Sequence, residues 1–482
     1  MFHGNKKKEK KPLTEEETKG IEDKLNKIKL ITEGILKKKQ EKDYSEKQLD
    51  NLLKSSVLMP DFYSLWNYRK DIIVHFKGIM EPQKFYEFIQ KEIKAIMPVM
   101  LKNPKSYVLW FHRIWLLKMA AEFETISNIT LEKSLLTGEI CLCDNFLIKD
   151  ERNFHCWNYR MKIFSLIEQF FPDAFPNFLQ KELEFTIQLI KKNFSNFSAW
   201  HYRTKIIPFH FKLNQLHFQS QESLNYLKED LEYITNAIFT APTEQSCWNY
   251  HHWIINNLIP IYVEKISYHN ETVSILFSNI FRIKDSSSIN LYCKNNLIDG
   301  FISSTEKIYG NKLEIKITDK NWDKLIILSL EGSEVKDSVK QHSEISCFTK
   351  HSVSFPKISI SKGENDKLTV EFVYNSEDYK KLFFEFLTSQ LKVVDDLINI
   401  EEKDKSFFYE FARYRKAQIE TFILFTIYNP LIPENKNEAE LLITKIKNQY
   451  KILIENSRRL KNMYETLLTN FKDSISEYSI IS

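Results

Sequence analysis

The chain has 482 residues, of which 43% are hydrophobic and 27% are charged, so it is long enough for two or three domains and too apolar to be disordered. Its 68 basic and 64 acidic residues leave a net charge of +4, which gives no support for nucleic-acid binding. Only 9 glycines occur, and neither GxGxxG nor GxxxxGK[ST] is present, so a glycine-rich nucleotide-binding loop is not expected.

The first residues, MFHGNKKKEKK, are polar and rich in lysine, and they lack the apolar core of a signal peptide. We expect residues 1–20 to form a flexible segment. No run of 18 apolar residues occurs, so no transmembrane segment is predicted. The six cysteines do not have the spacing of a disulfide framework. We therefore expect a cytoplasmic protein with reduced thiols.

A tryptophan motif recurs five times, and its tryptophans are 44, 47, 43 and 48 residues apart. An arginine follows three residues later in four copies, and His251 takes its place in the fifth. The residues of this frame are Trp66, Arg69, Trp110, Arg113, Trp157, Arg160, Trp200, Arg203 and Trp248. Such a recurrence indicates stacked helical hairpins.

In four copies an aromatic residue precedes the tryptophan by three positions. These aromatics are Tyr63, Tyr107, Phe154 and Phe197. Residues three apart share a helix face, so we expect each copy to present aromatic, tryptophan and arginine in one column. We interpret the tryptophans and arginines as packing and hydrogen-bonding groups at the seam between repeats, not as catalytic groups.

The helical pattern begins near Ile21, and partner helices such as 85–97 and 226–239 lie between the copies of the motif. Residues 21–262 are therefore predicted to form the helical repeats. Between 267 and 375 the apolar residues alternate instead, in runs such as LEIKI and LTVEFV, which is typical of short antiparallel strands.

The predicted fold is mainly α. We expect an α-α superhelix of hairpin repeats with an inserted small β-sandwich, Ig-like, over residues 267–375. Helical spacing returns over residues 377–482, and we expect these C-terminal helices to pack back on the repeats as a cap.

Cys141, Cys143, His155 and Cys156 resemble a set of metal ligands. However, Cys141 and Cys143 are two apart within an apolar helical stretch and so lie on different faces. We interpret these cysteines as buried free thiols. No nucleophile motif accompanies the serine and histidine residues, so independent hydrolase chemistry is not expected.

The recurring (N/P)-x-aromatic-x-x-W-x-x-R motif resembles the repeat of protein prenyltransferase α subunits. The versions NPKSYVLWFHR, DERNFHCWNYR and NFSNFSAWHYR are most similar to the type II branch, the Rab geranylgeranyltransferases. The resemblance is strong over residues 1–258 and weaker beyond.

This resemblance implies a crescent of helix pairs around a β subunit, which is an α-α barrel that holds a catalytic zinc and the isoprenoid pocket. It implies transfer of geranylgeranyl from geranylgeranyl diphosphate to C-terminal cysteines of Rab GTPases, which an escort protein presents. The zinc would be a cofactor of the β subunit and not of this chain.

The resemblance also implies site residues. The family contributes a diphosphate-contacting lysine and a tyrosine two residues later, which correspond to Lys105 and Tyr107. A lysine at a helix entry adds its charge to the anion-favouring helix end. The alternative is a solvated lysine beside a packed aromatic. Asn153 would face the same diphosphate or be a helix cap, which we favour, and Arg152 would add charge.

His3 is the remaining candidate. In the type II branch the N-terminal segment can reach the partner's zinc, so His3 would be a ligand, or else a histidine of a flexible tail. Two other functions stay open: an α subunit that serves CaaX substrates in a farnesyltransferase or type I geranylgeranyltransferase, and a non-enzymatic helical-repeat scaffold.

Overall fold

The computed structural model describes residues 15–216 and 220–258, nine strands between residues 263 and 373, and residues 377–403, 410–426, 428, 436–457 and 459–476. These residues are mainly helical. The helices are α1 Glu15–Gln40, α2 Glu46–Ser56, α3 Tyr63–Ile79, α4 Pro82–Lys102, α5 Tyr107–Ile126, α6 Leu135–Lys149, α7 Phe154–Phe170, α8 Phe175–Lys192, α9 Phe197–Leu213, α10 Gln221–Thr240, α11 Gln245–Leu258, α12 Glu377–Lys403, α13 Glu410–Thr426, α14 Lys436–Asn456 and α15 Lys461–Ser476. Contacts divide the chain into two compact units, Met1–Asn177 and Phe178–Ser482.

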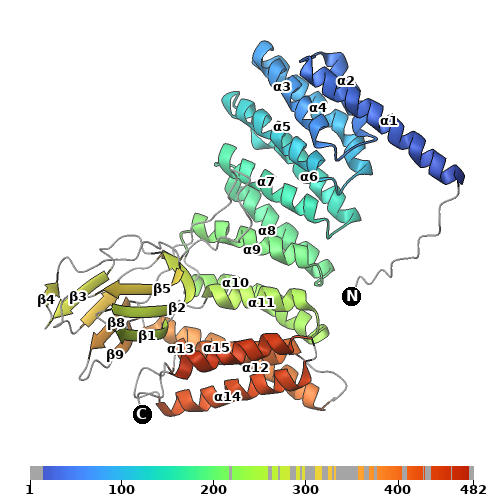
Figure 1. Cartoon of the computed structure of the whole chain (residues 1–482). Coiled ribbons are helices and arrows are strands. Elements are labelled where there is room, and N and C mark those ends of the chain that lie inside the picture. Colours follow the sequence, from blue (N-terminus) through green and yellow to red (C-terminus); the bar gives the residue numbers. More distant parts are fainter. Residues whose placement is uncertain are drawn as a thin grey trace. The chain divides into compact units, whose positions relative to one another are not determined.

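The first unit contains α1 and three antiparallel hairpins, α2/α3, α4/α5 and α6/α7, stacked side by side (Figure 1). Helix α1 begins at Glu15, so residues 15–20, which were expected to belong to a flexible segment, are helical. The helical pattern that was expected from about Ile21 forms two helices at its start, because a turn at residues 41–45 separates α1 from α2.

Short polar side chains start several of the helices. The Ser45 hydroxyl accepts the Gln48 amide at the start of α2, and the Ser134 hydroxyl accepts the Leu136 amide at the start of α6. Each bond satisfies an amide of the first turn that has no partner within the helix, and a cap of this kind contributes about 1 kcal/mol.

The tryptophans close the turns between the two helices of each hairpin. In every copy the indole Nε1 donates to the backbone carbonyl six residues earlier, for example from Trp110 to Pro104 at 2.9 Å. The aromatic three positions before is the first residue of its helix and lies exposed, with Tyr63 at 62% and Phe154 at 51%. The expected column is therefore only partly buried: its tryptophan and arginine lie in the core, but its aromatic residue is at the helix N-terminus and faces solvent.

Arg69, Arg113 and Arg203 bond the next helix along the chain, and Arg160 donates to Asp144 of the preceding helix α6 at 2.6 Å. Arg113 donates from Nε and Nη2 to both Glu139 oxygens at 2.6 Å, and its Nη1 donates to the Ile93 carbonyl at 2.8 Å. Arg69 with Glu92 and Arg203 with Asp230 repeat this arrangement. Although burial works against its charge, Glu139 and Tyr159 raise the pKa of Arg113.

Two of these carboxylates also accept a hydroxyl from the other helix of their own hairpin. Glu139 of α6 accepts the Tyr159 hydroxyl of α7 at 2.6 Å, and Asp230 of α10 accepts the Tyr250 hydroxyl of α11 at 2.6 Å. In α5 a histidine, His112, replaces this tyrosine. One buried acid thus joins the arginine of one hairpin to the hydroxyl of the next.

The strands belong to the second unit and form two sheets. They are β1 Val263–His269, β2 Thr272–Arg282, β3 Ile289–Cys293, β4 Asn296–Ile298, β5 Gly310–Lys316, β6 Lys324–Ile327, β7 Glu331–Gly332, β8 Lys357–Lys362 and β9 Leu368–Val373. The first sheet has the order β1-β2-β5, with β7 also paired to β2, and the second has the order β4-β3-β6-β8-β9. All of these pairs are antiparallel.

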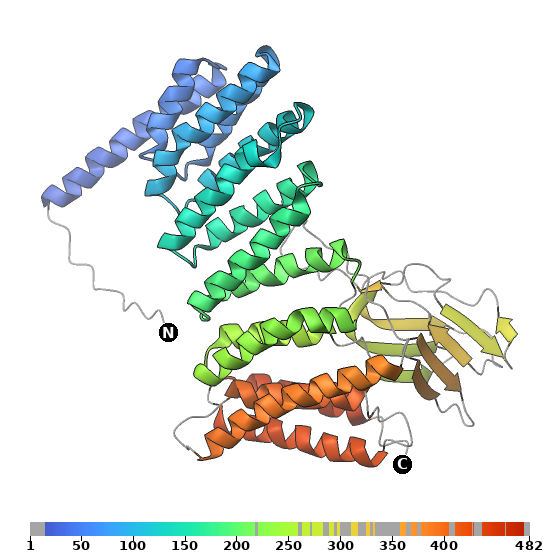
Figure 2. The same ribbon diagram turned by 180° about the vertical axis from the view of Figure 1, so that it is seen from behind.

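After the strands, α12 and α13 pack on the last tryptophan hairpin, α10/α11, as the helices in orange and red show beside the green ones in Figure 2. His251 Nε2 of α11 lies 3.0 Å from Gln390 Oε1 of α12. Arg415 of α13 donates to the Trp248 carbonyl at 3.0 Å. The strand segment is thus inserted between two helical hairpins that contact each other.

Replacing Arg113 with methionine should destabilise the chain by roughly 3–5 kcal/mol, because Glu139 would keep a buried charge without its counter-ion. Urea denaturation followed by circular dichroism measures this loss. Lys54→Met, which removes an exposed ion pair with Asp50 of 2.6 Å, should leave the midpoint unchanged. An equal loss of stability in both variants would contradict the conclusion that the buried Arg113–Glu139 pair matters more to folding than an exposed ion pair.

Glu420 of α13 should make stability depend on pH. It is 1% exposed, its Oε2 has no hydrogen-bond partner, and burial raises its pKa to about 7 against the opposing charges of Lys416 and Lys445, while Asp395 adds to the rise. Because the folded pKa exceeds the ordinary value near 4.5, stability is greatest below about pH 4.5 and falls as pH rises through 7.

Glu420→Gln should therefore be more stable than the parent at pH 8, by about 3 kcal/mol of unfolding free energy, and the difference should shrink to about 1 kcal/mol at pH 5. Thermal melts at pH 5, 6.5 and 8 test this. A difference that is the same at all three pH values would show that Glu420 is ionised throughout.

Candidate functional site

The loops that precede α3, α5 and α7 are hydrogen-bonded to one another, and with the first residues of these helices we call them the α3/α5/α7 edge. The Ser106 hydroxyl donates to Asp61 Oδ1 at 2.6 Å, which joins the first two loops. Asn153 Nδ2 donates to the Pro104 carbonyl at 3.4 Å, which joins the second and third. The same carbonyl accepts the Trp110 indole, so the edge is anchored to the core of the hairpins.

Lys105 lies on this edge, two residues before the first residue of α5. Its side chain is 72% exposed, and Nζ lies 3.6 Å from Asp150 Oδ2, whose side chain is 44% exposed. Asp150 follows the last residue of α6, and its Oδ1 accepts the Arg152 backbone amide at 3.3 Å. One oxygen of the Asp150 carboxylate therefore lies near the Lys105 ammonium, and the other accepts the backbone amide of Arg152.

Tyr107 is the first residue of α5, and its ring is half exposed on the same edge. It contacts the ring of His155 at 4.2 Å between centroids and that of Phe154 at 5.9 Å. His155 is 6% exposed, and its Nδ1 has no hydrogen-bond partner. Burial and then the charge of Lys105 lower the pKa of His155, against the opposing charge of Asp61, which favours the neutral form of the ring.

The two helix starts differ in their capping. Asn153 Oδ1 accepts the amides of His155 and Cys156 at 3.1 and 3.3 Å, so its carboxamide is engaged as the cap of α7. The corresponding Ser106 makes no such bond with α5, because its hydroxyl bonds Asp61. Amide N–H groups of the first turn of α5 therefore receive no side-chain cap.

An uncapped helix start with an adjacent ammonium group favours an anion. The amides and the macrodipole attract negative charge, and Lys105 adds a full positive charge on a flexible side chain. Groups of this kind stabilise the charge that builds up on a departing diphosphate. The chemistry of this edge therefore suits a phosphate-bearing group.

The other sequence-predicted residues lie elsewhere or outside the described residues. His3 belongs to residues 1–14, which are not described. The tryptophans and arginines of the repeat frame lie buried in the hairpins, away from solvent. Cys143 and Cys156 are buried, but Cys141 is exposed, so its expected burial was wrong: it lies on the outer face of α6.

No group of three or more potential ligands among His, Cys, Asp and Glu could hold a metal ion in the described part of the chain. None of the helices described here is both long enough and apolar enough to cross a bilayer.

Sequence reasoning missed the carboxylates on the edge. Asp150 begins the motif DERNFHCWNYR, and Asp61 occupies the place of Lys105 one repeat earlier. Their spacing from the tryptophan was a signal that they share the edge with Lys105. What the sequence alone could not provide was the distance across two hairpins.

Comparison with known proteins places the repeats in a family. The protein prenyltransferase alpha subunit repeat matches residues 89–120, 136–167, 179–209 and 227–258. The chain is 34% identical over 247 residues to the geranylgeranyl transferase type-2 subunit alpha of Homo sapiens and 33% identical to that of Rattus norvegicus. These matches cover 50% of this chain but only 39% of either relative, so the chain spans well under half of their length.

The subunit of the same name from Saccharomyces cerevisiae is 31% identical over 308 residues, which cover 62% of this chain and 87% of the relative. This match extends beyond the helical repeats, and it covers most of the yeast protein. The chain belongs to the geranylgeranyl transferase type-2 alpha subunit family of protein prenyltransferase alpha-subunit repeat proteins.

Proposed function

We propose that this chain is the α subunit of a heterodimeric Rab geranylgeranyltransferase. The complex transfers geranylgeranyl from geranylgeranyl diphosphate to C-terminal cysteines of Rab GTPases that an escort protein presents. The observation that carries the proposal is the uncapped start of α5 with the Lys105 ammonium beside it. The relatives' names favour this function over a subunit for CaaX substrates.

In this proposal Lys105 contacts the diphosphate and Tyr107 contributes beside it. The negative charge that accumulates on the departing pyrophosphate is met by the ammonium and by the amides of α5. Arg152 adds positive charge from the next loop. Asn153 caps the start of α7 and so fixes the backbone there. Its contribution to diphosphate binding is indirect, through this cap.

The β subunit is proposed to cover the α3/α5/α7 edge. Large apolar side chains are exposed at the ends of the even-numbered helices and the starts of the odd-numbered ones. These side chains are Val57, Tyr63, Leu101, Tyr107, Ile148 and Phe154. Exposed apolar groups gathered along one edge are typical of a protein-protein contact. The zinc and the isoprenoid pocket belong to that partner, and His3 is a candidate ligand to its zinc.

The remaining assignments follow the same proposal. Residues 21–262 form the α-subunit repeats, the strands within 267–375 form an inserted β-sandwich, and the helices of 377–482 close the repeats. The antiparallel pairing in two sheets supports a sandwich. The complex acts in the cytoplasm.

Lys105→Ala should lower the turnover of the heterodimer by about 10²- to 10³-fold, the usual effect of removing one group that stabilises developing negative charge. Steady-state transfer of labelled geranylgeranyl to Rab in the presence of escort protein measures this. Lys102→Ala removes a neighbouring lysine at the end of α4 and is the matched control. Unchanged turnover in an intact Lys105→Ala heterodimer would favour the scaffold function.

The purified chain should have no transferase activity until its β subunit is added, because the proposal assigns the zinc and the isoprenoid pocket to the partner. The measurement compares the chain alone, the β subunit alone and the reconstituted pair. Full activity of the single chain would overturn the proposed division of labour.

A further inference from the structure

Asp150 lies where it competes with an anionic ligand for Lys105. Its Oδ2 is 3.6 Å from the Lys105 ammonium, and its Oδ1 accepts the Arg152 backbone amide at 3.3 Å. Its own backbone amide donates to the Phe146 carbonyl at 3.0 Å and ends α6. The carboxylate is therefore anchored, whereas the lysine can move on its long side chain.

The position of Asp150 is unfavourable for the binding of an anion at this edge. A diphosphate at the start of α5 would lie close to a negative charge that already holds the best cation of the edge. The ion pair is exposed at both ends, so a ligand with several charges displaces it easily. The same pair re-forms once the ligand leaves.

A second carboxylate on the edge behaves differently. Asp61 accepts the Ser106 hydroxyl at 2.6 Å. Its negative charge raises the pKa of His155, whereas the positive charge of Lys105 lowers it. Asp61 is thus close to the site, but its nearest partner is a neutral hydroxyl. Of the two aspartates on this edge, Asp150 is the one paired with Lys105.

We propose, on the basis of the function proposed above, that Asp150 is a built-in competitor for Lys105 that weakens retention of the pyrophosphate leaving group. After transfer, inorganic pyrophosphate would remain between the ammonium and the uncapped start of α5. Asp150 offers Lys105 an alternative partner at that moment and so promotes release. Release of product limits turnover in many enzymes, which gives such a residue a function.

The test is the inhibition constant of inorganic pyrophosphate, measured on the heterodimer with escort protein and Rab. Asp150→Asn should lower this constant about two- to fivefold, the range expected for an exposed ion pair. Asp150→Glu should restore a value close to that of the parent, because it keeps the charge. In a Lys105→Ala background the Asp150→Asn change should have no further effect.

Asp50→Asn is the matched control. It neutralises an aspartate that pairs with Lys54 at 2.6 Å on α2 of the same unit, and this pair is also exposed, at 72% for the lysine and 55% for the aspartate. Its inhibition constant should equal that of the parent. Melting temperatures of all variants establish that each is folded.

An unchanged or higher inhibition constant in Asp150→Asn overturns the inference, and so does an equal fall in the Lys105→Ala background. If Lys105→Ala lowers turnover while Asp150→Asn has no effect, only the competitor role fails. If Lys105→Ala changes neither turnover nor the inhibition constant, the proposed role of Lys105 fails and the competitor role fails with it.

Discussion

A buried arginine that bonds a carboxylate of the next hairpin is the interaction on which both units depend. Removing two charges from water is costly, and the pair is tolerated only when every donor and oxygen is satisfied. Arg113 meets this condition with two bonds to Glu139 and one to a carbonyl of α4. Tyr159 takes a further bond to the same acid. Any slip in the packing of one hairpin on the next would leave a charge unpaired, so the pair selects the register.

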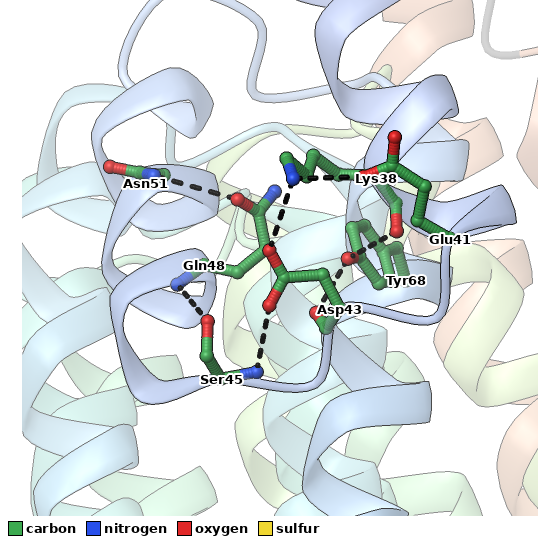
Figure 3. Close-up of polar contacts among 7 residues, drawn as sticks. All are labelled: Lys38, Glu41, Asp43, Ser45, Gln48, Asn51 and Tyr68. Atoms are coloured by element: carbon green, nitrogen blue, oxygen red, sulfur yellow. Dashed lines mark hydrogen bonds and ion pairs between the residues drawn. The ribbon is translucent and has the colours of Figure 1, made fainter.

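The charge balance extends to both ends of the series. Gln48 precedes Tyr68 by 20 residues, as each acid precedes its tyrosine, but no arginine lies before it, and a neutral amide stands there. The Tyr68 hydroxyl instead donates to the Asp43 carbonyl of the α1–α2 turn at 2.6 Å and also lies 2.9 Å from the Lys38 carbonyl in the last turn of α1 (Figure 3). In the other unit His251 replaces the arginine and faces Gln390, and burial lowers its pKa to about 3. At these two positions of the frame a neutral side chain thus stands where the other repeats have a charged one.

The repeat, its helices and the roles of tryptophan and arginine could be predicted because they recur at a nearly constant spacing. The acids were not predicted, because Glu92, Glu139 and Asp230 follow their arginines by the unequal spacings of 23, 26 and 27 residues. Their constant spacing is to the next copy of the motif, since Glu139 and Asp230 each precede a bonded tyrosine by 20 residues. The spacing of the repeat also did not predict that the side chains of Tyr63 and Cys141 are exposed. Periodicity specifies which residues share a face, but whether that face continues under a neighbour depends on where each helix ends.

The rigid hairpins and the exposed edge together explain why this chain would act only with a partner. The Pro104 carbonyl is held by Trp110 and Asn153, so the backbone next to Lys105 is fixed by the core. The ammonium itself is 72% exposed, and in water its attraction for a phosphate is strongly screened. A second polypeptide that covers the edge would exclude water and lower the local dielectric constant. The attraction of the same ammonium for a phosphate would then increase several-fold without any movement of the lysine. In the proposed heterodimer the helical repeats would supply the position of the cation, and the partner would supply the environment in which that cation becomes effective.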